Sequence, residues 1–355
     1  MSRTQIDPEK LHAFMQKAVS DMGAAISAPL VLLGDRLGLY KAMAEFGPMT
    51  SAQLAEKTGF LERYLREWLA AQAAGGYVTY NPETQEFTLP PEQALALAVN
   101  DSPCFIPGSI QVISSVFADE PKVRQAFKTG CGLGWHEHNC NLFEGTERFF
   151  RPSYAANLIG SWIPALDGVD EKLKHGAKVA DVGCGHGAST IVMAQAYPNS
   201  EFYGFDYHAP SIERATDAAK EAGIADRIHF KTVTSKEYPG TDYDFVTFFD
   251  CLHDMGDPIG AAEHVLKTLT SDGTWMIVEP FANDKLEDNL NPIGRMYYSA
   301  STMICTPASL SQEVGLALGA QAGEGRLKEV VMSAGFTRLR RATETPFNLI
   351  LEARP

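Results

Sequence analysis

The sequence predicts an α/β protein: a mostly parallel, doubly wound sheet preceded by a helical winged-helix domain. Three observations predict it. Short apolar runs alternate with helical patterns after residue 171, as a parallel sheet demands. One of those runs, 179–182, leads directly into a glycine-rich turn at 183–187 and then into a helical pattern. Before residue 100, two helical patterns joined by a tight turn precede a hairpin, which is typical of a winged helix.

The predicted sheet occupies the second half of the chain. Its strands are expected at 178–182, 201–206, 227–233, 243–250 and 273–280, with helices at about 188–197, 211–223 and 258–270. Residues 337–343 and 347–353 form two successive strands with only three residues between them, so this last pair is predicted to be antiparallel. An insertion at about 281–325 is longer than a compact sheet needs, and insertions of this kind usually cover an active site.

The first 100 residues predict a winged-helix domain whose charges do not suit DNA. Helical patterns cover 10–45, a short segment that Thr50 or Ser51 can cap and that ends in a turn at Gly59, and 61–74; the hairpin is expected at 75–80 and 86–89. Between Ala25 and Asn100 there are eight acidic and five basic residues. A DNA-reading helix needs a basic footprint, so dimerisation is the favoured role. A transcriptional regulator that senses a ligand remains the alternative. Residues 1–100 are thus a winged-helix dimerisation domain, 101–170 a helical connector and pocket lining, and 171–355 the ligand-binding domain.

Composition narrows the class of protein and of partner. The formal charge of −14 argues against nucleic acid or an anionic membrane as a partner. No unbroken run of about 18 apolar residues and no signal-peptide pattern is present, so we expect a cytoplasmic protein that does not span a membrane. The six cysteines include no Cys-x-x-Cys pair, which favours reduced thiols over disulfides or a zinc site.

The glycine turn and two acids indicate which ligand the sheet binds. Gly183, Gly185 and Gly187 let a backbone approach a nucleotide-like ligand closely, because glycine has no Cβ. Asp206 ends the next strand, where a ribose-binding acid belongs. Asp181 precedes the glycines and would repel a pyrophosphate. A ligand with a ribose, a positive charge and no phosphate fits both acids, as S-adenosylmethionine does. Another nucleotide, such as NAD, or a purely structural turn remains possible on these residues.

Candidate catalytic residues lie at the ends of two further strands. Asp250 ends the fourth strand and His253 lies one short loop beyond, while Glu279 ends the fifth strand. The carboxyl ends of parallel strands line the ligand crevice. A histidine there can take a proton from a substrate hydroxyl, and a carboxylate can fix its tautomer. The alternative is that His253 only caps the following helix and that Glu279 is a solvated strand end.

Two histidines in the connector, His136 and His138, invite a metal hypothesis. Their spacing of two residues suits no helical face, and no third ligand is apparent, so no metal is expected. Pocket lining or an ordinary loop position remains open for both.

Two motifs resemble a known family. Asp-Val-Gly-Cys-Gly-His-Gly at 181–187 resembles motif I of the class I S-adenosylmethionine-dependent methyltransferases. Leu-His-Asp-Met-Gly-Asp at 252–257 is similar to the Leu-His-Asp-Trp-Ser/Gly-Asp loop of small-molecule O-methyltransferases that carry an N-terminal winged-helix dimerisation domain. The resemblance covers nearly the whole chain. It implies a Rossmann-like class I methyltransferase sheet, a homodimer, and O-methylation of a small aromatic or polyketide-like hydroxyl compound.

The resemblance also implies roles for individual residues. His253 corresponds to the general base and Glu279 to the acid that orients it, while Glu324 is a possible match to a second family acid. Met255 stands where the family usually has Trp, and the insertion departs from the family's form, so the identity of the methyl acceptor does not carry over. The expected cofactor-binding residues are those of the glycine turn and of the adjoining strand ends: Asp181, Gly183, Gly185, Gly187, Asp206, Tyr207 and Asp250.

Overall fold

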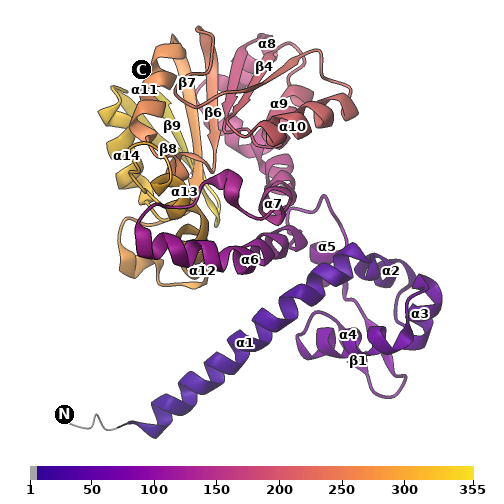
Figure 1. The fold of residues 1–355 in the computed structure, drawn as a ribbon. Helices are drawn as coiled ribbons and strands as arrows, with labels where there is room; N and C mark the ends of the chain where they lie inside the picture. Colours follow the sequence, from indigo (N-terminus) through magenta and orange to yellow (C-terminus); the bar gives the residue numbers. More distant parts are fainter. Residues whose placement is uncertain (1–5) are drawn as a thin grey trace. The chain divides into compact units, whose positions relative to one another are not determined.

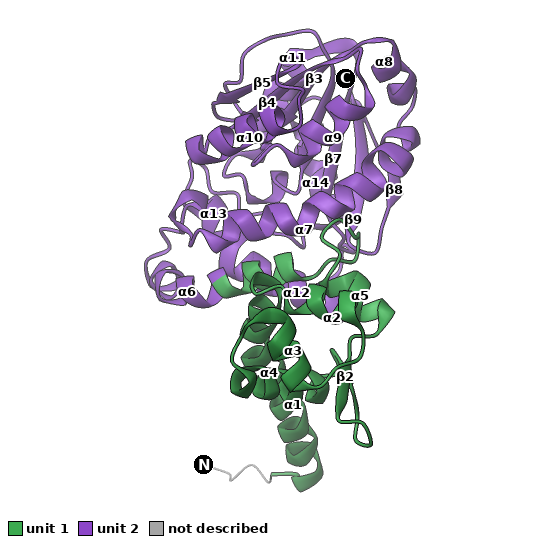
Figure 2. Ribbon diagram, turned by 90° about the vertical axis from the view of Figure 1, so that its right-hand side faces the viewer, with its two compact units in different colours: residues 1–114 green, residues 115–355 purple. Residues whose placement is uncertain are grey.

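The computed structural model describes residues 6–355. The chain divides into two compact units, the first ending at residue 114 and the second covering 115–355 (Figure 2). In the first unit, a long helix α1 (Pro8–Arg36) is followed by the helices of a winged helix and by a short hairpin. Its elements are α2 (Leu39–Phe46), α3 (Ser51–Thr58), α4 (Glu62–Ala74), β1 (Thr79–Asn81), β2 (Glu86–Thr88) and α5 (Pro91–Leu97). The predicted winged helix is therefore confirmed.

Specific contacts hold this first unit together. Thr50 and Gln53 form a capping box that starts α3, and Gly59, with a φ of 76°, ends it. The buried Trp68 ring of α4 donates its N–H to the Leu30 carbonyl oxygen of α1 at 2.9 Å. Tyr64, four residues before Trp68 in α4, is 77% exposed.

The charges of α4 do not suit DNA. Arg63 pairs with Glu67 and Arg66 pairs with Glu62 along the helix, so acids neutralise both of its arginines. Since DNA binding rests on basic side chains that are free to meet phosphates, the regulator hypothesis is not favoured.

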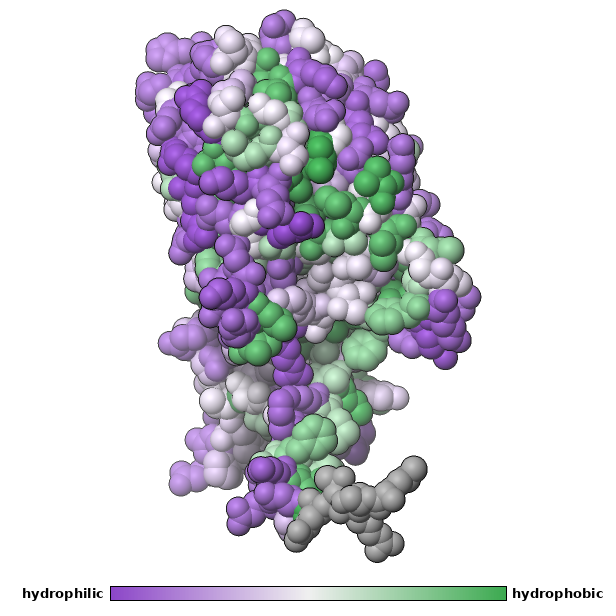
Figure 3. Space-filling view, turned by 90° about the vertical axis from the view of Figure 1, so that its left-hand side faces the viewer, coloured by the Kyte–Doolittle hydropathy of each residue, from purple (hydrophilic) through white to green (hydrophobic). Residues whose placement is uncertain are grey.

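Helix α1 carries an unusual number of exposed apolar side chains. Phe14, Val19, Met22 and Ile26 are each more than half exposed. Figure 3 shows apolar residues, in green, at the surface of the part of the molecule that carries this helix. Within residues 6–355, α1 is the single helix whose length and composition would allow it to cross a membrane. Polar residues interrupt the apolar ones along α1, so no unbroken apolar run in the sequence predicted this finding. One such helix near an N-terminus is weak evidence for a membrane span, and an unpaired subunit interface shows the same exposure.

The second unit is built on a seven-stranded sheet with the order β5-β4-β3-β6-β7-β9-β8. The strands β3 to β7 are parallel, and β9 is antiparallel to both of its neighbours, β7 and β8, which confirms the predicted sheet and its antiparallel last strand. Their bounds are β3 (Lys178–Val182), β4 (Glu201–Asp206), β5 (Ile228–Thr232), β6 (Tyr243–Phe249), β7 (Leu269–Pro280), β8 (Arg338–Glu344) and β9 (Asn348–Arg354).

Helices cover both faces of this sheet (Figure 1). Successive β3 residues point to opposite faces: Val179 packs with Met193 in one core, and Ala180 packs with Val265 in the other. The first core takes side chains from α8 (Val169–His175), α9 (Ala188–Ala196) and α10 (Ala209–Glu221). The second takes them from α11 (Pro258–Thr268) and α14 (Gly323–Ser333). This is the doubly wound arrangement that the alternating pattern predicted.

Two segments differ from the sequence expectation. In the connector, the sequence pattern predicts helices at 107–128 and 153–165. Helix α6 (Pro107–Thr129) matches the first, but α7 (Asn141–Asn157) begins twelve residues before the second and runs through Pro152, which lies buried inside it. Proline normally interrupts a helix, so a helix that runs through Pro152 departs from the local preference of its sequence. The insertion is largely helical: η5 (Leu286–Asn289), α12 (Pro292–Ala300), the π-helical turn η6 (Ser301–Cys305) and α13 (Thr306–Leu310).

Candidate active site

A cavity of about 760 Å³ opens at the carboxyl ends of β3, β4 and β6. Parallel strands direct their carboxyl ends to one edge of the sheet, so this is where a doubly wound fold places its ligand. The connector and the insertion contribute to its wall. The lining includes Trp135, His136, Glu147, Phe150, Tyr154, Gly183, Cys184, Gly185, Asp206, Tyr207, Asp250, Cys251, Asp254, Met255, Ala308, Ser311, Gln312 and Glu313.

The glycine turn between β3 and α9 uses its three glycines differently. All have a positive φ, between 52° and 77°, which side chains rarely adopt. A Cβ on Gly187 would meet the Phe230 ring at 2.6 Å, so this glycine lets α9 approach the sheet. A Cβ on Gly183 would meet the Cys251 sulfur at 2.7 Å. Gly185 has nothing within 4 Å and faces the cavity, so there a Cβ would take space from a ligand.

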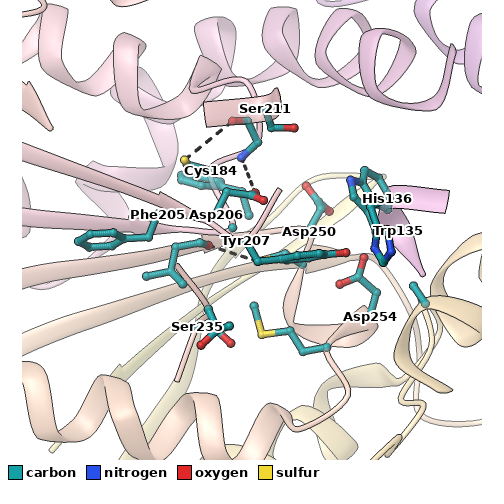
Figure 4. Close-up of a pocket in the computed structure, with 18 of the residues that line it drawn as sticks. Trp135, His136, Cys184, Phe205, Asp206, Tyr207, Ser211, Ser235, Asp250 and Asp254 are labelled. Atoms are coloured by element: carbon teal, nitrogen blue, oxygen red, sulfur yellow. Dashed lines mark hydrogen bonds between the residues drawn. The ribbon is translucent and has the colours of Figure 1, made fainter. Parts of the chain in front are cut away.

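Asp206 lies where the sequence placed a ribose-binding acid. It ends β4 and lines the cavity (Figure 4), and it accepts hydrogen bonds from the backbone N–H groups of Gly185 at 3.0 Å and His208 at 2.8 Å. Burial raises the pKa of this carboxyl, and the two backbone hydrogen bonds oppose the rise. Tyr207, the next residue, also lines the cavity, with its ring edge-on to His136.

Asp181 does not lie where a cofactor-binding residue should. It is 1% exposed, and its carboxylate accepts hydrogen bonds from Ser189 at 2.7 Å, Thr190 at 2.6 Å and Thr247 at 3.0 Å. It is not among the residues that line the cavity. The structure therefore places the Asp181 side chain behind the turn and not in the cavity wall: its carboxylate joins β3, β6 and the first turn of α9.

Two carboxyl groups line the cavity beyond the end of β6. Asp250 has a φ of 50°, and its carboxylate accepts hydrogen bonds from Tyr154 at 3.3 Å and from Asn348 at 3.0 Å. Burial, followed by the negative charge of Glu279, raises the pKa of Asp250 to about 8. Burial likewise raises the pKa of Asp254 to about 7. Both groups disfavour a further negative charge in this part of the cavity, and a positive charge there would favour their ionised forms.

His253 and Glu279 form a buried pair beside the cavity. The His253 Nδ1–H donates to Glu279 Oε2 at 2.5 Å, and Glu279 Oε1 accepts the Leu252 backbone N–H at 2.9 Å. The two side chains are 4% and 1% exposed and neither lines the cavity. Burial lowers the pKa of His253, but the Glu279 carboxylate and the sulfur of Cys305 together raise that pKa well above the ordinary histidine value. Because Glu279 takes Nδ1–H, the basic lone pair of the neutral ring lies on Nε2.

The atom next to His253 Nε2 belongs to a residue that the sequence interpretation missed. The Cys305 sulfur, at the end of η6, lies 3.3 Å from Nε2. Glu324, the possible second acid, forms an ion pair with Arg341 instead. No motif marked Cys305, because it lies in the insertion, 52 residues from His253.

The two connector histidines have different surroundings. His136 lines the cavity. His138 is buried against Asp119, with Nδ1 at 3.0 Å from the carboxylate, and does not line it. Within residues 6–355, no group of three or more His, Cys, Asp or Glu side chains is placed to hold a metal ion.

Comparison with known proteins identifies both units. Residues 24–99 match the model of the Rv2258c-like winged HTH domain, and residues 173–334 match that of a methyltransferase domain. The chain belongs to the class I methyltransferases with an N-terminal winged-helix domain. The class uses S-adenosylmethionine as its methyl donor.

Individual relatives of this methyltransferase are distant. The 27-O-demethylrifamycin SV methyltransferase of Amycolatopsis mediterranei is 25% identical over 181 residues, covering 50% of this chain and 53% of that protein. The chain spans about half, or less, of the length of the curated relatives it matches. Among solved structures, the mitomycin 7-O-methyltransferase MmcR aligns with a TM-score of 0.69 and 19% identity, covering 98% of this chain and 100% of that one. Human N-acetylserotonin methyltransferase in complex with SAM aligns with a TM-score of 0.66 and 16% identity, covering 100% and 99%.

The methyltransferase cavity has features that fit S-adenosylmethionine. Gly185 leaves open space at the turn, and Asp206 ends β4 one strand away from that turn, as a ribose requires. On the opposite side of the turn, β6 leads to Asp250 and Asp254. Burial raises the pKa values of these two carboxyl groups, and a ligand that carries positive charge at this end would favour their ionised forms.

Proposed function

We propose that this methyltransferase transfers a methyl group to a hydroxyl oxygen of a small aromatic or polyketide-like compound, with His253 as general base. Glu279 orients the ring. The observation that carries the proposal is the buried Glu279–His253 pair, in which Nδ1–H is fixed at 2.5 Å and Nε2 remains the basic atom. A histidine that only capped the following helix would need no buried carboxylate partner. Asp257, not His253, caps that helix, by accepting the Gly260 backbone N–H.

The donor would be held along the edge of the sheet. In this proposal, the backbone at Gly183 and Gly185 lies against it, Asp206 takes the ribose hydroxyls with Tyr207 beside it, and Asp250 lies near its charged end. Asp181 and Gly187 support the turn from behind. When bound, S-adenosylmethionine supplies a methyl group made electrophilic by a positively charged sulfur.

The chain's own residues then accept the proton of the acceptor and limit the access of water. His253 Nε2 takes the proton of the acceptor's hydroxyl, and the Glu279 carboxylate stabilises the imidazolium that forms. The insertion limits the access of water because it is bound to the His253 loop: Ser309 donates to the Met255 carbonyl oxygen and the Gly319 N–H donates to that of His253. Positioning of this kind is worth several kcal/mol of barrier.

Two measurements test the proposal in sequence. Calorimetry with S-adenosylmethionine and S-adenosylhomocysteine comes first, and no binding of either at high micromolar concentration contradicts it. A panel of phenols and hydroxylated polyketides with isotopically labelled donor follows, with the labelled product analysed for O-, N- or C-methylation. Labelled product on nitrogen or carbon alone contradicts O-methylation while leaving the methyltransferase in place.

The exposed apolar face of α1 supports a second part of the proposal, a homodimer. Phe14, Val19 and Ile26 have exposed fractions of 64%, 60% and 80%. A subunit interface is the simplest structure that covers an apolar face of this kind in a protein of net charge −14. The partner surface would be the same face of a second copy, as in an isologous dimer.

A further inference from the structure

Cys305 contacts the one atom of His253 that matters for proton transfer. Its sulfur is 3.3 Å from Nε2, while Nδ1 is already bound to Glu279. The thiol is 8% exposed, so water does not compete for this contact. A hydroxyl that gives its proton to Nε2 must come within hydrogen-bonding distance of that nitrogen, and the sulfur already occupies this position.

The backbone that carries Cys305 is fixed over the His253 loop. It ends η6, a π-helical turn, and turns of this type occur frequently at functional sites. Hydrogen bonds join the segment 309–319 to the loop 253–256. They are Ser309 Oγ to Met255 O, Gln312 Nε2 to Asp254 O, Gly256 N to Gln312 Oε1, Leu316 N to Gly256 O and Gly319 N to His253 O. The close approach of sulfur and imidazole is therefore a consequence of the way in which the insertion is attached.

We propose that Cys305 is a positioning residue of the proposed base: it binds Nε2 and holds the place that the acceptor's hydroxyl must take. The inference rests on the proposed function. In the imidazolium form, Nε2–H donates to the sulfur, and in the neutral form Nε2 accepts the S–H. With Glu279 on the other nitrogen, the ring is held at both ends.

The charged groups around His253 determine what a titration of the ring will show. Glu279 on β7 and Cys305 on η6 contact it, and Asp250 and Asp254 at the end of β6 interact with its charge. The sulfur contact adds to the rise in the pKa of His253 that Glu279 produces. Removing the sulfur, with the acids left in place, lowers that pKa.

The test is NMR of the full chain labelled on histidine ring nitrogens, without donor or acceptor. His253→Gln identifies the His253 signals among those of the nine histidines. Cys305→Ser keeps a group that can bind Nε2, Cys305→Val keeps the volume without it, and Cys305→Ala removes both. Cys104→Ala, which removes an exposed thiol of the first unit, is the control.

The expected result is a His253 Nε2 shift and titration midpoint close to wild type in Cys305→Ser and Cys104→Ala. In Cys305→Val and Cys305→Ala, the Nε2 signal moves and the midpoint falls. A His253 Nε2 signal in Cys305→Val that matches wild type overturns the proposal, because the thiol then only fills space. Equal changes of this signal in the Cys305→Ser and Cys305→Val variants overturn it for the same reason. The comparison of Cys305→Ser with Cys305→Val is sufficient to test the proposal, so it can still be tested if the Cys305→Ala variant folds poorly. Donor binding is not involved, so failure here is distinct from failure of the methyltransferase proposal.

Discussion

The Asp206 carboxylate accepts a hydrogen bond from the Gly185 backbone N–H at 3.0 Å, which joins the end of β4 to the glycine turn. The acid expected to hold the ribose thus also fixes the backbone that faces the ligand. Asp206→Asn should weaken binding of S-adenosylhomocysteine by roughly 10- to 100-fold, the worth of a charged hydrogen bond. Calorimetry measures this. Asp217→Asn, at an exposed ion pair with Lys220, is the control and should bind normally. Equal affinity of Asp206→Asn and the control would remove Asp206 from the donor site.

Alanine at two glycines of the turn should separate binding from stability. Gly185→Ala places a methyl group in open space at the cavity, so donor affinity should fall at least tenfold. Because an alanine there must keep the positive φ, the free energy of unfolding should fall by about 1 kcal/mol. Gly187→Ala meets the Phe230 ring at 2.6 Å and should lower the melting temperature more. Calorimetry and thermal melting of both variants provide the comparison, and the reverse order would contradict the assigned roles.

His253→Ala should lower turnover by about 10²–10⁴-fold at saturating donor while leaving donor affinity within a few-fold. Because Glu279 raises the pKa of His253, the wild-type rate should rise with pH above the ordinary histidine range and then level off. Glu279→Gln should lower turnover and move the rise to lower pH, because the imidazolium loses its carboxylate. Near-normal turnover of a well-folded His253→Ala protein would rule out the base.

Asp250 makes stability depend on pH. Its folded pKa, about 8, lies above that of an unfolded aspartate, so the folded state holds the proton more tightly and stability falls as pH rises toward 8. Asp250→Asn keeps the acceptor for Asn348 and removes the charge. The variant should therefore melt at a higher temperature than wild type at pH 9, with a smaller difference at pH 5. Melting curves without ligand at both pH values test this, and a constant difference would show that Asp250 is ionised throughout.

Charge on the exposed face of α1 should separate the subunits. Phe14→Glu combined with Ile26→Glu places two carboxylates on this face. Light scattering at micromolar concentration should give twice the chain mass for wild type and the single mass for the variant. Leu286→Glu, at a site 60% exposed in the second unit, is the control and should remain dimeric. A wild-type protein of single chain mass would contradict the homodimer.

The sheet could be predicted from sequence because each strand is a local pattern of apolar residues. The same applies to Asp206 and Glu279, which end strands and so come to the cavity edge of the sheet. Helix α7 could not be delimited, because packing tolerates Pro152 against its local preference. The position of the Asp181 carboxylate behind the turn could not be predicted, because one of its hydroxyl partners, Thr247, comes from another strand. Cys305 had no local signal, because the path of the insertion depends on contacts that form only in the folded protein.

Strand β9 lies between β7 and β8 although it is the last strand in sequence order. Its first residue, Asn348, donates to Asp250 across 98 positions of the chain. During synthesis, β7 emerges from the ribosome long before its neighbour exists, and its edge stays unpaired until residue 354 has been added. Pairings between such distant segments form slowly and leave strand edges exposed. The hydrogen bond from Asn348 to Asp250 at the cavity is therefore complete only after β9 has paired with β7.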